Sequence, residues 1–221
     1  KGASLDYAAL GAARGGHYEY CDKLIEKGAS LNHAALGAAL GGHERYCQRL
    51  IERGANPAFA VLGAALSNNR SHCDNLIESG ASLDYAALGA AAFSAFGILM
   101  GESNSEEFTY YQVLLKLGAS LNYIAMGAAL GGAYAYCKEL LRDNPACADY
   151  IAWGAGLRGD YSYCDELIAQ GENINSIMIG AAQGGHSAYC AKLLKQGASL
   201  RYAVEGAALG GHYDYCKTLI T

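Results

Sequence analysis

Four histidines lie four residues before a cysteine, a spacing that could support thiol chemistry. The pairs are His17–Cys21, His43–Cys47, His186–Cys190 and His212–Cys216. A cysteine becomes a nucleophile when a neighbouring base or cation stabilises its thiolate, and residues four apart on a helix lie on one face. However, the same pair recurs along the chain, as scaffold residues do. We therefore expect no catalytic residues and interpret the chain as a non-enzyme.

Histidine and cysteine are also metal ligands, but their distribution argues against a metal centre. A zinc site needs several ligands at one point, whereas repeated units spread equivalent residues along a line. Asp160 and Ala133 replace the histidine in two of the copies. No glycine-rich phosphate loop follows a strand pattern either. We expect neither a metal nor a cofactor.

The chain consists of short repeats. The sequence "GASL" recurs at Gly2, Gly28, Gly80, Gly118 and Gly197, with "GANP" at Gly54 and "GENI" at Gly171. Self-similarity at a fixed period is the signature of a repeat architecture. We expect one repeat domain over residues 1–221 with eight units, namely 1–27, 28–53, 54–79, 80–117, 118–143, 144–170, 171–196 and 197–221.

Each unit reads as two helices joined by a tight turn. The serine of "GASL" is a good N-cap, and an Asp or Asn two residues later suits the positive helix end. In the third unit Asn56 should cap a helix that opens with Pro57. A "GG" pair ends the first helix, and the glycine of the next "GA" ends the second. The sequence thus predicts an all-α solenoid of helix-turn-helix repeats.

The spacing resembles the ankyrin-repeat family over the whole chain. The second unit supplies the family pattern at Ala38, Ala39, Gly42, His43, Cys47, Leu50, Ile51, Gly54 and Ala55. Two features depart from it: the Thr-Pro-Leu-His box is missing, and most units have 26 or 27 residues instead of about 33. The deficit falls where the family carries its β-hairpin finger. The resemblance implies an ankyrin-like fold without fingers.

The repeated small residues favour close packing. A glycine precedes each alanine pair or its equivalent, although glycine inside a helix costs about 1 kcal/mol relative to alanine. We expect these glycines to let the first helices of neighbouring units approach closely. The alternative is that they form the floor of a ligand groove. The glycines are Gly11, Gly37, Gly63, Gly89, Gly127, Gly154, Gly180 and Gly206.

Seven of the eight cysteines share one register of the repeat, where the family has a buried aliphatic residue. We expect them to be buried, unpaired thiols, since stacked helices lie about 8–10 Å apart and a disulfide needs closer Cα atoms. Cys147 lies outside the register and could be exposed. Unpaired cysteines in this number indicate the cytoplasm or another reducing compartment. The tyrosine before each cysteine should stack on its counterparts in neighbouring units.

Charge and hydropathy restrict the classes of partner that we expect the chain to bind. The formal net charge is −5 and basic residues form no dense run, which argues against nucleic acid and anionic membrane surfaces. No window approaches the ~18 unbroken apolar residues of a membrane span, so we expect no membrane insertion. The remaining class is a protein or peptide partner of unknown identity.

An aromatic row on the first helices is the leading candidate for partner binding. Residues three and seven positions later add aliphatic side chains to the same stripe. In the ankyrin family this side faces the concave surface. The alternative is that much of the stripe is buried, because a long exposed apolar patch is a liability. The candidates are Tyr7, His33, Phe59, Tyr85, Tyr123, Tyr150 and Trp153.

The fourth unit carries an insertion at about 93–104. It contains Phe93, Phe96 and Met100, followed by the polar run "GESNSEE". We expect a longer first helix and then a loop. Long loops in compact repeats often carry function, and a locally packed embellishment is the alternative. We count these three residues among the partner-binding candidates.

These features predict a protein–protein interaction scaffold that binds through the first-helix surface and the insertion. The alternative is a structural spacer of a larger effector whose activity lies elsewhere. Both end units keep apolar consensus residues, so we expect further repeats or domains of the same protein to flank them. The resemblance suggests eukaryotic cytosolic proteins, or effectors that intracellular bacteria deliver into the host cytosol, as settings.

Overall fold

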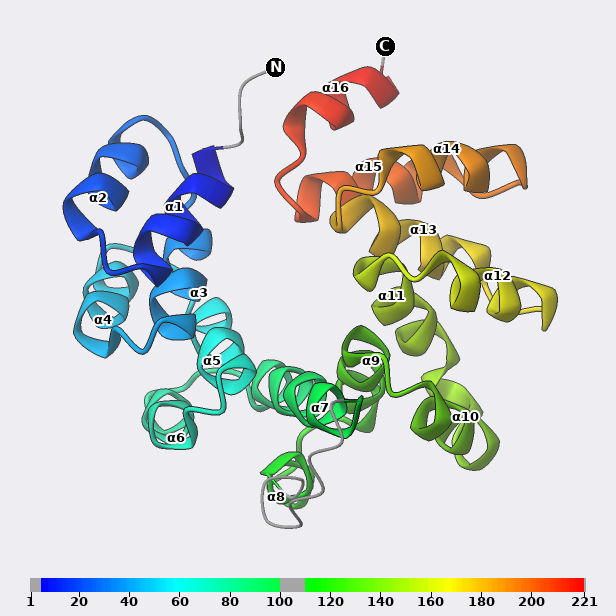
Figure 1. The fold of residues 1–221 in the computed structure, drawn as a ribbon, viewed down its shortest axis with the longest axis horizontal. Coiled ribbons are helices and arrows are strands. Elements are labelled where there is room, and N and C mark those ends of the chain that lie inside the picture. The colour runs from blue at the N-terminus through cyan, green and yellow to red at the C-terminus, as the bar shows by residue number, and fades with distance from the viewer. Residues whose placement is uncertain (1–4, 100–109, 221) are drawn as a thin grey trace. The chain divides into compact units, whose positions relative to one another are not determined.

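The structure is a computed structural model that describes residues 5–99 and 110–220, without the side chains of 96–99. Within these residues it contains α-helices and one short 3-10 helix, and no strand. Within each of two compact units the helices pack in sequence on their neighbours (Figure 1). The predicted all-α solenoid of helix-turn-helix repeats is therefore confirmed.

Helices alternate along the chain as the first and second members of hairpins. The first helices are α1 (Leu5–Arg14), α3 (Leu31–Leu40), α5 (Pro57–Leu66), α7 (Leu83–Leu99), α9 (Leu121–Gly131), α11 (Ala148–Arg158), α13 (Ile174–Gln183) and α15 (Leu200–Leu209). The second helices are α2 (Tyr18–Glu26), α4 (Glu44–Glu52), α6 (Arg70–Glu78), α8 (Tyr110–Lys116), α10 (Tyr134–Asp143), α12 (Tyr161–Ala169), α14 (Ser187–Lys195) and α16 (Tyr213–Ile220). A 3-10 turn, η2 (Pro145–Cys147), precedes α11.

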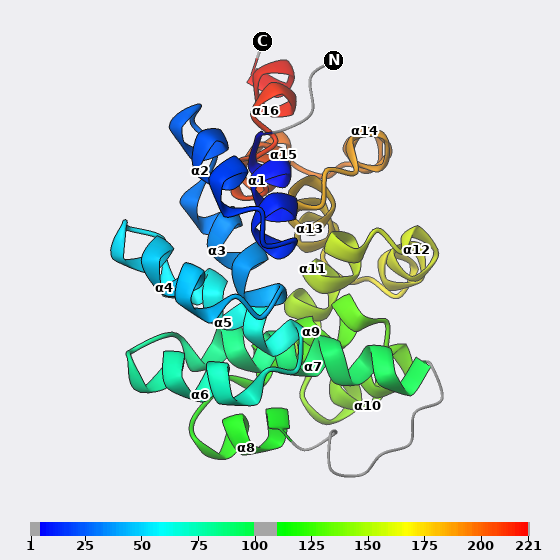
Figure 2. The ribbon, with the colours of Figure 1, turned by 60° about the vertical axis from the view of Figure 1, so that its left-hand side comes forward.

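The chain divides into two compact units. The first comprises Lys1–Phe93 and Asn104–Ser120, and the second comprises Ser94–Ser103 and Leu121–Thr221. In the first unit α1 packs on α3 and α3 on α5; in the second α9, α11, α13 and α15 pack in that order. The second helices of each unit lie along one side of this layer (Figures 1 and 2). The prediction that residues 1–221 form one repeat domain stays a prediction.

Helix ends follow the local sequence. Asn56 accepts a hydrogen bond from the backbone N–H of Ala58, and Pro57 opens α5, as predicted. Ser30 occupies an N-cap position, but its side chain makes no capping bond. Instead, its backbone N–H donates to the carboxylate of Asp6 at 2.6 Å. The predicted role of the serine hydroxyl is therefore wrong at this helix, because a side chain of the preceding repeat caps it.

The same inter-repeat cap recurs along the chain. A carboxylate or amide oxygen at the second position of a first helix accepts the N–H that opens the next first helix. The measured distances are 2.7 Å for Asn32 to Asn56, 2.6 Å for Asp84 to Ser120, and 2.8 Å for Asn175 to Ser199. Each such bond fixes the start of one repeat against the helix before it.

The glycines inside the first helices lie against the backbone of the preceding repeat. A methyl group placed on Gly63 would lie 2.6 Å from the carbonyl oxygen of Leu36 and 3.0 Å from Cβ of Ala39. Such a distance to a carbonyl oxygen leaves no room for a side chain. The close approach is therefore confirmed for six of the eight predicted glycines, whereas Gly11 of the first repeat has no neighbour within 4 Å. The equivalent residues in contact with a preceding first helix are Gly37, Gly63, Gly89, Gly154, Gly180 and Gly206.

A second set of contacts ties the second helices together. The hydroxyl of Tyr46 donates to Asp22 of the preceding repeat at 3.1 Å, and its ring stacks on Tyr18 with centroids 4.5 Å apart. Tyr163 stacks in the same way on Tyr134, at 3.9 Å. The prediction that each such ring stacks on its own counterpart is therefore wrong for these two tyrosines. Each packs instead on the tyrosine that opens the preceding second helix.

The glycine contacts predict opposite effects of one substitution at two positions. Gly63→Ala should lower the free energy of unfolding by about 1–2 kcal/mol, because overpacking outweighs the gain in helix propensity. Gly11→Ala should raise it by about 1 kcal/mol, since no atom lies within 4 Å of the new methyl group. Urea unfolding of both variants measures the difference. Equal effects at the two positions would contradict the close approach.

The tyrosine contacts predict a second matched pair. Tyr46→Phe should destabilise the fold by about 1 kcal/mol, since it removes a hydrogen bond to a carboxylate. Tyr163→Phe should be neutral or stabilising, because the Tyr163 hydroxyl is buried and has no hydrogen-bond partner within the described residues. Thermal unfolding monitored by circular dichroism compares them. A larger loss from Tyr163→Phe than from Tyr46→Phe would refute this assignment.

Candidate interaction surface

Rings on the first helices form a ladder in the first compact unit. Tyr7 and His33 meet edge to face with ring centroids 5.8 Å apart, and His33 and Phe59 lie 6.4 Å apart. Tyr7 is 47% exposed, and His33, Phe59 and Tyr85 are partly exposed. Aromatic pairs at these separations attract one another. The rings of Tyr7, His33 and Phe59 therefore each contact a neighbouring ring, while part of each ring is exposed to solvent.

A tighter aromatic cluster lies on the second compact unit. Tyr123 and Tyr150 are 5.7 Å apart, and Tyr150 and Trp153 are 6.4 Å apart. The indole N–H of Trp153 donates to the side-chain oxygen of Gln183 at 2.8 Å. All these rings are partly exposed. The hydrogen bond fixes the orientation of the indole between α11 and α13.

Aliphatic side chains extend the ring ladder along the same helices. Leu88 and Met126 of this stripe are buried, and most of its other side chains are partly exposed. These include Leu10, Leu36, Leu40, Leu62, Leu66, Leu130, Leu157 and Ile179. Polar residues interrupt the stripe in the outermost repeats, where Arg14 and Glu205 are exposed.

The insertion is described only in part. α7 extends over Leu83–Leu99, 17 residues against 10 in α3 and α5, so the predicted longer first helix is confirmed. Phe93 lies on this helix and is partly exposed. The side chain of Phe96, and Met100 with the loop that follows it, lie outside the described residues. Their predicted role in partner binding stays a prediction.

The histidine and cysteine pairs have separate structural partners. Nε2 of His43 lies 3.1 Å from the carbonyl oxygen of Arg14 in the preceding repeat, so a ring protonated at Nε2 donates to it. The Cys47 thiol is fully buried and donates to the carbonyl of Ala35 at 3.8 Å. Burial raises the pKa of this thiol to about 12. At neutral pH Cys47 is therefore protonated, and it occupies the interface between the two helices of its repeat.

Arg158 makes the histidine's contact in the sixth repeat, a role that the sequence did not predict. Asp160 occupies the histidine position of its repeat and caps α12 by accepting from the N–H of Tyr163. The carbonyl of Leu130 in the preceding repeat instead accepts from Arg158, at 2.8 Å. The sequence feature that could have indicated this contact is Arg158, two residues before the position at which this repeat lacks the histidine. The carbonyl at the end of the first helix is thus satisfied by a different donor.

Cys147 is not exposed, contrary to the alternative that the sequence left open. Its side chain is 2% exposed, and its thiol donates to Asn122 at 3.4 Å. It is the last residue of the 3-10 turn Pro145–Cys147, which stands at the place where other repeats carry the "GA" pair. The eight cysteines are all buried and unpaired. This arrangement agrees with the predicted register of the other seven.

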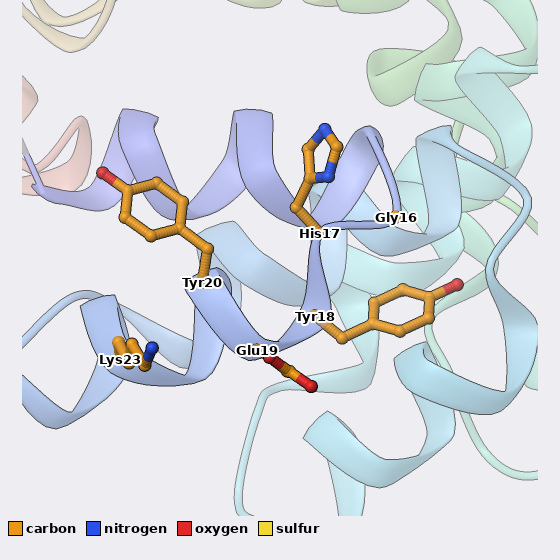
Figure 3. A pocket seen from close by; sticks show the side chains of 6 residues that line it. All are labelled: Gly16, His17, Tyr18, Glu19, Tyr20 and Lys23. Carbon is orange, nitrogen blue, oxygen red and sulfur yellow. The ribbon is translucent and has the colours of Figure 1, made fainter.

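Two shallow pockets lie at the turns of the first two hairpins, away from the ring ladder. One has a volume of about 440 Å³ and is lined by Gly16, His17, Tyr18, Glu19, Tyr20 and Lys23. Figure 3 shows that these side chains point in different directions and converge on no common point. Within residues 5–99 and 110–220, no three His, Cys, Asp or Glu side chains gather as a metal site would require.

Comparisons with known proteins assign no family to the chain. No family model matches it, and no curated protein is significantly similar to it. None of the described helices has the length and apolar character needed to cross a membrane. The ankyrin resemblance therefore stays an expectation from the sequence, and function has to be argued from the surface itself.

Burial of the thiols predicts slow and pH-insensitive labelling. The native chain should react with Ellman's reagent at a rate limited by unfolding, and raising the pH from 7 to 9 should give no thiolate-driven acceleration. The reason is that the reagent reaches a buried thiol only after the chain opens, so the rate of opening, and not the thiolate fraction, limits the reaction. An exposed cysteine with an ordinary pKa of about 8.5 would accelerate more than tenfold. Rapid labelling of any cysteine in the native chain, compared with a urea-unfolded control, would contradict the structure.

Proposed function

We propose that this chain is an interaction scaffold that binds a protein or peptide partner through the ring ladder of its first helices. The observation that carries the proposal is the ladder itself, in which every repeat except the seventh, which has Ser176, adds one ring at the same position. Every ring in it remains partly exposed. Aromatic side chains held in place lose little entropy on binding and are common hot spots of interfaces.

The cluster around Trp153 is the strongest candidate for a binding hot spot. Tyr123, Tyr150 and Trp153 come from two adjacent helices, α9 and α11, and Gln183 of α13 holds the indole from a third. A partner's apolar side chain would meet rings whose positions are already fixed. Such preorganisation reduces the entropic cost of association. The unit-four insertion, including Phe93, Phe96 and Met100, is the second part of the proposed surface.

The compartment is part of the same proposal. The cysteines are unpaired and buried, a state that supports function in a reducing compartment such as the cytoplasm. Delivery into a host cytosol as part of an effector would place the chain in the same redox environment. Enzymatic activity is not part of the proposal, because the histidine and cysteine pairs serve the fold.

Truncation of the ring cluster tests this function. The intact chain would be immobilised and used to capture partners from an extract of the source cells. The double variant Tyr150→Ala, Trp153→Ala should lose at least tenfold in affinity for each specific partner, because it removes two central rings. Deletion of 93–107 tests the insertion in the same assay.

The matched control is Tyr213→Ala, which truncates an aromatic residue that is 60% exposed on the second helix α16. It should leave capture unchanged. Circular dichroism confirms that each variant is folded before affinities are compared. If the intact chain captures no specific partner, or if neither the ring variant nor the deletion changes capture, the chain acts as a spacer and the proposal fails.

A further inference from the structure

The second helix of the fourth repeat, α8, exposes apolar side chains where the other repeats do not. Val113 is 45% exposed and Leu117, directly after the helix, is 62% exposed. The two are four residues apart and lie on the same side of the helix. The opposite face of α8 is anchored in the core by Tyr110 and Leu114, both buried. The exposed pair is therefore held in a fixed position by the fold.

Alignment of the repeats shows how unusual this pair is. At the position of Val113 the other repeats carry polar or charged residues, namely Lys23, Arg49, Asn75, Glu139, Glu166, Lys192 and Thr218. At the position of Leu117 they carry Lys27, Arg53, Ser79, Asp143, Gln170 and Gln196. These two neighbouring positions are polar in each of the six other copies that contain both, and they are apolar together in the fourth copy.

In other repeats a cation at these positions pairs with an aspartate one repeat earlier. Arg49 and Arg53 contact Asp22 at 3.4 and 2.5 Å. Lys192 contacts Asp165 at 2.6 Å. A tyrosine hydroxyl donates to the same aspartate in each case, from Tyr46 to Asp22 and from Tyr189 to Asp165. The complete arrangement is an aspartate with one tyrosine and at least one cation.

Asp74 has the tyrosine but no ion-paired cation from the following repeat, although Arg70 of its own helix lies over the Tyr110 ring, 5.5 Å from the centroid. Its carboxylate accepts from the hydroxyl of Tyr110 at 2.7 Å, and it forms no ion pair with any residue that the structure describes. Val113 and Leu117 occupy the positions from which a cation would reach it. Asp74 is exposed, and Glu78, one turn further along α6, is exposed as well. The surface therefore combines two exposed carboxylates with an apolar pair, and Arg70 lies beside it on α6.

We propose that this acidic and apolar surface on α6 and α8, formed by Asp74, Val113 and Leu117, docks a partner segment that carries an arginine or lysine flanked by apolar residues. The partner's cation would fill the place that Arg49 and Arg53 fill at Asp22. Its apolar side chains would cover Val113 and Leu117. Complementary charge would set the register of the bound segment, and the apolar contact would supply buried surface area. The proposal does not depend on the ring ladder.

The test uses a random 16-residue peptide library displayed on phage and the whole chain as target. Selection on the wild-type chain is combined with counter-selection on the double variant Val113→Lys, Leu117→Arg. This variant restores the residue types of the other repeats at two exposed positions, so it should fold and retain its stability. Circular dichroism and urea unfolding check that it does.

Enriched peptides are then synthesised and their affinities measured by fluorescence anisotropy. We expect them to share a basic residue flanked by apolar residues. Their affinity should fall at least tenfold in Val113→Lys, Leu117→Arg and in Asp74→Asn, and should weaken as salt is added. Asp22→Asn is the matched control, since that aspartate already has cationic partners, and it should have no effect. The variant Tyr150→Ala, Trp153→Ala should bind these peptides normally, which separates this surface from the ring ladder.

Three outcomes would overturn the proposal. One is the enrichment of no peptide on the wild-type chain over the counter-selected variant. Another is a set of peptides without basic residues, or with unchanged affinity for Asp74→Asn. The third is binding that appears only after deletion of 100–109, because the surface would then be covered by a segment of the same chain.

Discussion

The close approach of neighbouring first helices is the contact on which the other features of each compact unit depend. Gly63 meets the carbonyl of Leu36 and the methyl group of Ala39 at distances that exclude any side chain. Glycine Cα–H groups at such interfaces contact carbonyl oxygens and contribute weak hydrogen bonds. The helix-propensity cost of about 1 kcal/mol per glycine is offset by the packing of two backbones. One repeat is thereby fixed on the next within a narrow range of positions.

Several polar contacts follow from that fixed spacing. Because the close contact at the glycines recurs within each compact unit, a side chain can reach a defined backbone group one repeat away. His43 reaches the carbonyl of Arg14, and Asp6 reaches the N–H of Ser30. Where a repeat loses one of these residues, another donor takes over, as Arg158 does for the carbonyl of Leu130. The chemistry of the contact is retained while the residue changes.

The sequence allowed the repeats, the hairpins, the close approach at the glycines and the buried cysteines to be predicted, because these depend on local periodicity. Contacts between repeats were harder to predict. The capping of Ser30 by Asp6 and the stacking of Tyr46 on Tyr18 depend on how far one repeat is offset from the next, which no single repeat specifies. Cys147 is buried at the end of a 3-10 turn that the repeat pattern did not predict. The exposed Val113 became informative only when its position relative to Asp74 was known.

The surface thus combines constant and variable parts. Gly63, Ala39 and their equivalents maintain the stack, while the ring ladder and the α8 surface differ from repeat to repeat. The stack itself is tested most directly by nuclear Overhauser contacts in isotopically labelled protein. The account predicts strong contacts between the α-protons of Gly63 and the methyl group of Ala39, one repeat away. Their absence in a folded sample with assigned resonances would contradict it.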